Sequence, residues 1–236
     1  MQKLSYDPNL ITAVRWLIVL AMPFMLGLGT IRAVILWDYP AWEYQRIPSD
    51  QFGFTDEERL DLAQATLAYM QRPEPAEQVI YMLEELRLPG TDAPLYNERE
   101  IDHMIDVKVV ADGMWRVTQI AIIVVMAGIL FLVARPFSRQ EAYRGIFYGG
   151  LATTAVLLSI GLLIGLAWEF FFIQFHELLF PPGTWMFARS DSLIRLFPEQ
   201  FWFDVGVLIS GGALLLGVLV TALGYGLLKL SNRYLV

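Results

Sequence analysis

Four long apolar stretches alternate with polar segments along the 236-residue chain. They cover residues 14–37, 114–134, 145–173 and 203–228, and the few ionisable side chains inside each stretch lie mostly near its ends. About 20 apolar residues are enough for a helix to cross the hydrocarbon core of a bilayer, where a helix satisfies its own backbone hydrogen bonds. The pattern therefore predicts an all-α integral membrane protein with four transmembrane helices.

Composition agrees with this prediction and removes several kinds of chemistry. Hydrophobic residues make up 56% of the chain, more than in an ordinary soluble domain. We interpret residues 14–37 as a retained span rather than a signal peptide, because the stretch is long and contains Pro23 and Arg32. The chain has no cysteine, which excludes disulfides, thiolate metal sites, a cysteine nucleophile and lipid attachment to cysteine.

Charge gives the spans an expected orientation. Arginine and lysine in short loops favour the cytoplasmic side, and such residues flank the predicted inner ends of the spans: Lys3, Arg15, Arg135, Arg139, Arg144, Lys229 and Arg233. Both termini are therefore expected in the cytoplasm. Residues 38–113 carry 17 acidic and 6 basic side chains, and we expect them outside. This acidic balance does not suit nucleic-acid binding, which needs a basic face.

Helix-start signals recur in the expected outer segment, residues 38–113. Thr55 and Asn97 are each followed three positions later by Glu, which is the spacing of a capping box. Pro75 is a suitable residue for the start of another helix. The segment therefore predicts three short helices, the third of which runs almost directly into the second span with Gly113 as its weak point.

A second outer segment, residues 174–202, is rich in Phe and Trp and is interrupted by the helix-breaking sequence PPG. Its later part, SDSLIRLFPEQF, is amphipathic, which is typical of a segment in the membrane interface. The segment is either an aromatic belt with a surface helix or a lid beside His176 that faces lipid acyl chains. No repeat divides the chain, so we expect a single membrane domain of residues 1–236.

The only two histidines of the chain, His103 and His176, both fall on the expected outer side. His103 lies on the predicted helix before the second span, and His176 follows the third span. Charged residues lie on the helical face of His103 or beyond His176: Arg99, Glu100, Asp106, Glu177, Asp191, Arg195 and Glu199. These groups are either solvated interfacial charges with two incidental histidines, or parts of one site.

Two segments resemble the signature segments of a known family. NEREIDHMIDVK at residues 97–108 and FHELLFPPGTWMFARSDSLIRLFPEQFW at residues 175–202 are similar to those of the lipoprotein intramolecular transacylase family of bacterial integral membrane proteins. The resemblance implies a four-helix protein of the bacterial plasma membrane with an extracytoplasmic active site and no cofactor. It also implies transfer of the sn-2 acyl chain of a diacylated lipoprotein from the diacylglyceryl group to the α-amino group of the same cysteine, in contact with membrane lipid.

The same resemblance places the family's catalytic histidines at His103 and His176. An ester-to-amide shift needs acid–base catalysis, to which histidine is suited at neutral pH. We predict His103 as the base and His176 as its assistant, and the reverse order stays open. Predicted supporting residues are Arg99, Arg195 or backbone N–H groups for the oxyanion, Asp102, Asp106, Glu177 and Asp191 for orienting an imidazole, and Glu100 as a further neighbour. Residues expected beside acyl chains are Trp185, Phe187 and Phe197.

Three rival classes remain open. A zinc protease is suggested by HELLF, which begins like H-E-x-x-H, but Phe180 stands where the second histidine is needed. His103, His176 and one carboxylate could still bind a metal, although we predict none. A serine hydrolase could use Ser190 or Ser192, but the chain has no G-x-S-x-G elbow. A non-enzymatic transporter or assembly factor could have the same four spans, but the chain has no internal repeat.

Overall fold

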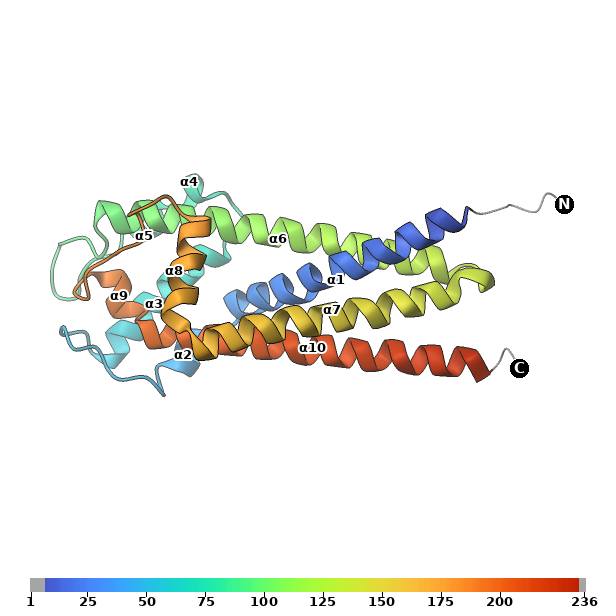
Figure 1. Cartoon of the computed structure of the whole chain (residues 1–236). Helices are drawn as coiled ribbons and strands as arrows, with labels where there is room; N and C mark the ends of the chain where they lie inside the picture. Colours follow the sequence, from blue (N-terminus) through green and yellow to red (C-terminus); the bar gives the residue numbers. More distant parts are fainter. Residues whose placement is uncertain (1–6, 234–236) are drawn as a thin grey trace. The chain divides into compact units, whose positions relative to one another are not determined.

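The computed structural model describes residues 7–233, and every regular element in this range is a helix. Four helices are long and apolar enough to cross a membrane: α1 (Pro8–Leu36), α6 (Glu98–Val133), α7 (Arg139–Leu166) and α10 (Glu199–Arg233). They are the longest helices in Figure 1. The predicted all-α fold with four transmembrane helices is confirmed. Lys3 and both chain ends lie outside the described residues, so the expected orientation stays a prediction.

Helix α6 joins two chemically different segments without a break at Gly113. Residues 98–113 hold seven charged side chains, whereas the part from Met114 onward is mostly apolar. At 1.5 Å per residue, its 36 residues extend for about 54 Å, while the hydrocarbon core of a bilayer is about 30 Å thick. We therefore take residues 114–133 as the membrane-spanning part and residues 98–113 as the part outside it.

The structure corrects the third predicted span. Instead of continuing to residue 173, α7 ends at Leu166, and a separate helix, α8 (Trp168–Leu179), begins after Ala167. Ala167 has φ −147° and ψ 52°, outside the helical region. Residues 174–179, expected in a loop, are therefore helical. Hydropathy cannot locate this break, because apolar residues lie on both sides of it.

Packing divides the chain into two compact units. Unit 1 comprises the described residues of 1–30, 114–162 and 208–236, and unit 2 comprises residues 31–113 and 163–207. Domain boundaries normally fall in exposed linkers. Each of the four long helices contributes to both units, so the division gives no boundary of that kind, and the single domain stays a prediction.

The core of unit 1 is apolar and is built around α1. Its buried members are Ile18, Met22, Val125, Leu132 and Ala142. A Cβ atom on Gly128 would lie 2.9 Å from the Ile18 side chain, so only glycine allows this close approach. Arg15 forms an ion pair of 2.6 Å with Glu141 in the same unit. Small residues and one ion pair thus hold α1 against its neighbours.

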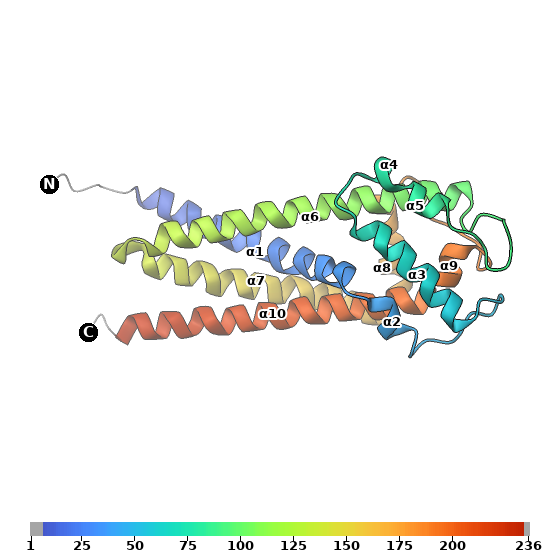
Figure 2. The same cartoon turned by 180° about the vertical axis from the view of Figure 1, so that it is seen from behind.

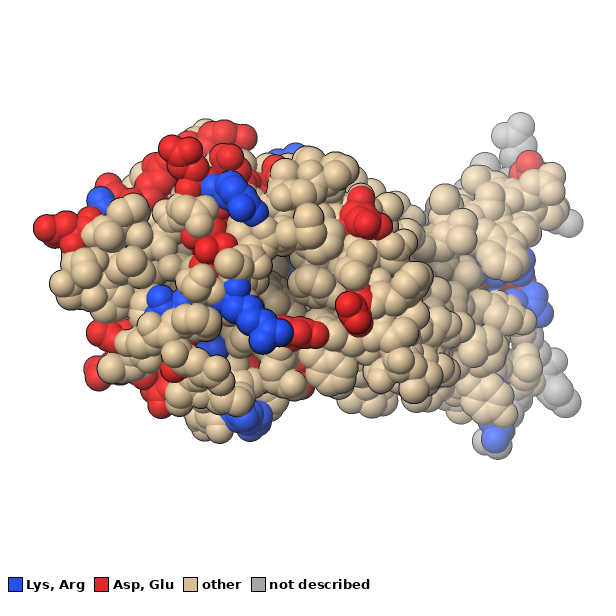
Figure 3. Space-filling model, turned by 60° about the vertical axis from the view of Figure 1, so that its left-hand side comes forward, with Lys and Arg blue, Asp and Glu red and all other residues tan. Residues whose placement is uncertain are grey.

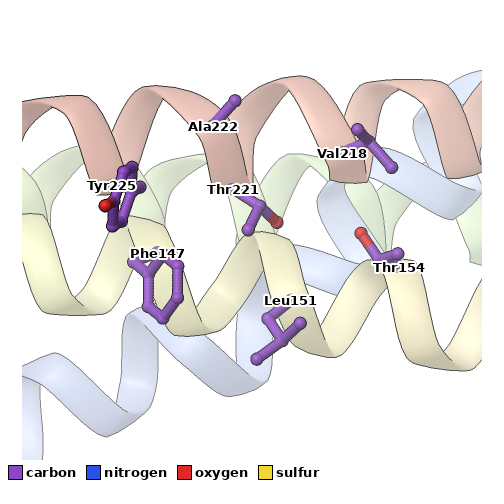
Figure 4. Close-up of a pocket in the computed structure, with 7 residues that line it drawn as sticks. All are labelled: Phe147, Leu151, Thr154, Val218, Thr221, Ala222 and Tyr225. Atoms are coloured by element: carbon purple, nitrogen blue, oxygen red, sulfur yellow. The ribbon is translucent and has the colours of Figure 1, made fainter.

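Helices α7 and α10 approach each other closely within unit 1. A Cβ atom on Gly150 of α7 would lie 2.5 Å from the backbone nitrogen of Thr221 in α10. Small residues at such contacts are common between transmembrane helices. An apolar groove of about 310 Å³ opens beside the contact (Figure 4), and it is lined by Phe147, Leu151, Thr154, Val218, Thr221, Ala222 and Tyr225.

Unit 2 contains the shorter helices. Their bounds are α2 (Tyr39–Glu43), α3 (Asp56–Gln71), α4 (Ala76–Val79), α5 (Tyr81–Glu84), α8 and α9 (Ser192–Leu196). Helix α3 contacts α2, α5 and α9, as can be followed in Figure 2. Charged side chains gather over this unit in Figure 3, in keeping with the acidic composition of residues 38–113.

Both predicted capping boxes form in unit 2. The Thr55 hydroxyl accepts a hydrogen bond from the Glu58 N–H, and the Glu58 carboxylate accepts one from the Thr55 N–H. Asn97 and Glu100 exchange the same two bonds at the start of α6. The helix predicted after Pro75 forms as two consecutive short helices, α4 and α5. Local sequence signals therefore place these three helix starts correctly, whereas α2 was not predicted.

Candidate active site

His103 lies in the part of α6 that precedes its membrane-spanning residues, and only 6% of its surface is exposed. The rings of Phe180 and Phe187 flank its imidazole, with centroids 5.0 and 5.3 Å away. Its Nδ1 atom is buried and has no hydrogen-bond partner within residues 7–233. The imidazole therefore presents an unengaged ring nitrogen in an aromatic environment.

His176 lies in α8, and its orientation is set by the helix itself. Its Nδ1 atom is 2.7 Å from the carbonyl oxygen of Phe172, four residues earlier in the helix. A carbonyl oxygen only accepts hydrogen bonds, so Nδ1 carries the proton of the neutral imidazole and Nε2 keeps an available lone pair. This bond thus selects the tautomer that can accept a proton through Nε2.

The two imidazoles face each other within unit 2. Their ring centroids are 6.4 Å apart and their planes are inclined by 22°. Phe180 is in contact with both rings, at 5.0 Å from His103 and 5.5 Å from His176. This spacing is short enough for one ester-sized group to touch both imidazoles.

Trp185 completes the aromatic lining of the histidine pair. Its ring centroid lies 4.9 Å from that of His176 and 6.4 Å from that of Phe172. The Nε1 atom of Trp185 is buried and has no hydrogen-bond partner among the described residues. Together with Phe187, which lies against His103, Trp185 brings the segment between α8 and α9 onto both imidazoles.

Burial lowers the pKa of both histidines. The pKa of His103 falls from 6.5 to about 4, because of burial first and the neighbouring His176 second. Burial also lowers the pKa of His176, while its hydrogen bond with the carbonyl oxygen of Phe172 opposes this shift. A lowered pKa means that the neutral form is favoured. Both imidazoles are therefore neutral at pH 7.

Glu100 connects the helix of His103 with the segment that covers the site. The residue is only 1% exposed, and its carboxylate accepts hydrogen bonds from the N–H groups of Leu193, at 2.7 Å, and Asn97, at 2.8 Å. Burial raises the pKa of Glu100, although these two hydrogen bonds oppose the shift. The first turn of α6 and the start of α9 are thereby joined.

Helix α9 is also held at its other end. Arg59 of α3 donates to the carbonyl oxygen of Arg195 at 3.1 Å, and the Tyr44 hydroxyl donates to that of Leu196 at 2.5 Å. Arg195 forms a buried ion pair of 2.8 Å with Asp50. Burial raises the pKa of Asp50, but hydrogen bonds from Arg195 and backbone N–H groups outweigh it, so the pKa is lowered overall.

The predicted oxyanion donors and one predicted lipid contact have other partners in unit 2. Arg99 is exposed and donates to the carbonyl oxygen of Met186, and Arg195 pairs with Asp50. Both arginines thus already have protein acceptors. Phe197 is only 7% exposed and packs against the rings of Phe201 and Trp202, at 5.2 and 6.1 Å. This burial does not suit the acyl-chain contact that we expected of Phe197.

The predicted carboxylates do not hold the Nδ1 atom of either imidazole within the described residues. Glu177 is exposed and accepts a hydrogen bond from Gln174, while Asp191 accepts one from the Ala188 N–H. Asp102 is exposed, and Asp106 is half-buried. A backbone carbonyl orients His176 instead. In residues 7–233, no three His, Asp or Glu side chains form a group that could hold a metal ion.

Sequence reasoning missed two residues of the site. Phe172 supplies the carbonyl oxygen that orients His176, and Phe180 contacts both imidazoles. Both lie four residues from His176, which is the spacing of neighbours on one helical face. This spacing could have identified Phe172 in particular, since an imidazole in a helix reaches the carbonyl oxygen of the preceding turn.

Known proteins resemble this chain in sequence. The family model described as "Lipoprotein intramolecular transacylase Lit" matches residues 16–202, which include both histidine segments. An uncharacterized protein from Aquifex aeolicus (strain VF5) is 29% identical over 211 residues, covering 88% of this chain and 91% of that protein.

Solved structures extend the similarity to the fold. The membrane integral lipoprotein intramolecular transacylase Lit from Bacillus cereus is 20% identical, with a TM-score of 0.79 over 96% of this chain and 100% of that one. A histidine-to-alanine variant of that protein gives a TM-score of 0.73 at 20% identity, over 95% and 96% of the two chains. Because the family model covers well over half of its residues, this chain belongs to the lipoprotein intramolecular transacylase family, and it is an acyltransferase of the membrane.

Proposed function

We propose that the protein moves the sn-2 acyl chain of a diacylglyceryl-cysteine lipoprotein to the α-amino group of the same cysteine. The product is an N-acyl lipoprotein that retains a lysoglyceryl group. The observation that carries the proposal is the pair of neutral histidines, buried His103 and half-buried His176, whose rings face each other at 6.4 Å inside an aromatic lining. An ester-to-amide shift needs a proton acceptor and a hydrogen-bond donor at one place, and this pair can supply both.

His176 is the base in this proposal. Its Nδ1 proton is engaged by the carbonyl oxygen of Phe172, which leaves Nε2 as the proton acceptor. The lowered pKa of His176 keeps Nε2 unprotonated at neutral pH. These contacts favour the reverse of the order that we predicted from the sequence, in which His103 was the base.

His103 acts as a neutral donor. A group whose pKa is about 4 is a weak base at pH 7 and carries no charge. A neutral imidazole can nevertheless donate its single N–H to an oxygen that gains negative charge. The Nδ1 atom of His103 has no partner within residues 7–233, so the ring can turn one nitrogen toward the glyceryl oxygen of the substrate.

The reaction then balances without a nucleophile from the enzyme. The neutral amine attacks the ester carbonyl carbon and gives its proton to Nε2 of His176. The tetrahedral intermediate collapses by breaking the bond between the carbonyl carbon and the glyceryl oxygen, and that oxygen receives the proton from His176. The amide and the free glyceryl hydroxyl are the two ends of one product molecule.

Proximity supplies much of the rate in this scheme. Amine and ester belong to the same substrate. An enzyme that holds two such groups in a reactive orientation can lower the activation free energy by roughly 7 to 11 kcal/mol in favourable cases. The site belongs to unit 2, which contains the acidic segment 38–113 and lies on the expected extracytoplasmic side. The substrate is therefore a diacylated lipoprotein in the outer leaflet of a bacterial plasma membrane, with membrane lipid around it.

The proposal is tested by expressing the protein in a bacterium whose lipoproteins are only diacylated. Mass spectrometry of N-terminal lipopeptides should then find an N-acyl chain together with a lysoglyceryl group. His103→Gln and His176→Gln should abolish this product, whereas Glu169→Gln, at an exposed position of α8, should retain it. Unchanged diacyl lipopeptides from well-expressed wild-type protein would refute the proposal, and release of free fatty acid would identify a hydrolase instead.

A further inference from the structure

The proposed reaction places negative charge on the carbonyl oxygen of the substrate, and the site needs a donor for it. The two arginines near the site are already engaged, since Arg99 donates to the Met186 carbonyl and Arg195 pairs with Asp50. His176 uses its Nδ1 proton on a backbone carbonyl. Neither of these arginines nor the Nδ1 proton of His176 is therefore free to serve as this donor.

Trp185 has a donor with no acceptor. Its Nε1 atom is buried, and no hydrogen-bond partner lies near it in the part of the chain that the structure describes. Buried N–H groups are normally paired, because an unpaired one has lost its bond to water and gained nothing in return. An unpaired donor in a substrate-binding site is thus a place where a ligand atom can supply the missing acceptor.

The ring of Trp185 is fixed at the reacting centre. It lies 4.9 Å from the imidazole of His176, and Phe172 is its other aromatic neighbour at 6.4 Å. An indole offers one N–H and no acceptor, so its nitrogen can only donate. A donor held in this way does not have to reorganise when charge develops, which is the property of an effective oxyanion site.

We propose that Trp185 is a catalytic residue that donates its indole N–H to the carbonyl oxygen of the sn-2 ester. The inference rests on the proposed acyl transfer. When the amine attacks, the π electrons of the carbonyl move to the oxygen, and the hydrogen bond from Nε1 strengthens. When the glyceryl oxygen leaves, the electron pair returns to form the amide carbonyl. Trp185 neither gains nor loses a proton.

A role in packing alone makes a different prediction. Trp185→Phe keeps an aromatic ring against His176 and Phe172 but removes the N–H, whereas Trp185→Leu removes both. If the donor matters, both variants lose activity to a similar extent. If only the ring matters, Trp185→Phe stays active and Trp185→Leu does not.

The experiment measures kcat and KM of the purified full-length protein in detergent with a synthetic diacylglyceryl-cysteine peptide. For Trp185→Phe we expect kcat to fall about 100-fold, the usual effect of losing one oxyanion donor, with little change in KM. Trp202→Phe is the matched control, because that tryptophan is 40% exposed and packs against Phe197 and Phe201. It should keep wild-type kcat.

Binding of a diether analogue, which lacks the carbonyl oxygen, provides a second readout. Trp185→Phe should bind this analogue as tightly as the wild type does, since the analogue cannot accept the hydrogen bond. A kcat near the wild-type value, or a loss of analogue binding equal to the loss of kcat, would overturn the proposal. A wild-type protein that forms no N-acyl lysoglyceryl product would instead show that the proposed function itself is wrong.

Discussion

Glu100 accepts a 2.7 Å hydrogen bond from the backbone N–H of Leu193, 93 residues further along the chain. Glu100 lies three positions before His103, and Leu193 lies eight positions after Trp185. The bond therefore ties the helix that carries one histidine to the segment that covers the other.

Removing this connection should disturb the site. Glu100→Gln keeps one oxygen for one of the two N–H groups, whereas Glu100→Ala leaves both without their acceptor, at a cost of about 1 to 3 kcal/mol for the buried N–H of Leu193. We expect a small loss of thermal stability and activity in Glu100→Gln and a larger loss of both in Glu100→Ala. Thermal unfolding in detergent and kcat/KM measure the two effects. Equal losses of thermal stability and of kcat/KM in the two variants would contradict a structural role for the bond between Glu100 and Leu193.

Each histidine should be essential for the rate. Proton transfer by a positioned side chain contributes about 10²- to 10⁴-fold, so His103→Gln and His176→Gln should each lower kcat by at least about 100-fold. The double variant should be little worse than either single variant, because the two imidazoles act on one proton-transfer sequence. Single-turnover rates with the synthetic lipopeptide measure this. If the losses of kcat in the two single variants multiply in the double variant, the histidines act independently.

The pH dependence of kcat/KM should have two limbs. In the proposed mechanism the neutral imidazole of His176 is the active form, and its lowered pKa keeps it neutral down to below pH 6.5. A fall in rate caused by protonation of His176 should therefore appear only below pH 6.5. At higher pH the rate should rise as the substrate α-amino group, whose usual pKa is about 7.7 to 8.0, loses its proton.

A substrate analogue with a less basic amine separates the two limbs. It should shift the upper limb toward lower pH and leave the lower limb in place, since only the upper limb belongs to the substrate. Movement of both limbs together would assign both to the amine and would remove the support for a histidine base.

The ion pair between Asp50 and Arg195 should matter for stability more than for chemistry. Its side chains are only 2% and 11% exposed, and breaking such a pair typically costs about 3 to 5 kcal/mol. Asp50→Ala or Arg195→Met should lower the thermal unfolding midpoint, and the double variant should recover part of the loss. The folded fraction should keep most of its kcat. A large loss of kcat without loss of stability would return Arg195 to the role of oxyanion donor.

Features that depend on neighbouring residues could be predicted from the sequence. The capping boxes at Thr55 and Asn97 form as predicted, because their partners are three residues away and the bonds are local. The four transmembrane helices follow from apolar length alone. The two histidines are brought together as expected, within one unit and with 6.4 Å between their rings.

Features that depend on backbone detail or distant contacts could not be predicted. The break at Ala167 leaves no trace in hydropathy, since Leu166 and Trp168 continue the apolar stretch. The bond between Glu100 and Leu193 joins residues 93 positions apart, and no local pattern reports it. Carboxylates were the predicted candidates for orienting an imidazole, but a backbone carbonyl orients that of His176, and every residue carries such a group.

The aromatic lining of the histidine pair also bears on which acceptor takes the acyl chain. A histidine base can activate water as readily as an amine, and water would release a fatty acid and leave a shortened lipoprotein. The rings of Phe180 and Phe187 offer water no strong hydrogen-bond partners beside the imidazole of His103. The amine arrives attached to the ester and needs no such partners to stay in place. In the proposed reaction, such a lining would keep the acyl chain on the substrate, so that the membrane anchor is rearranged rather than lost.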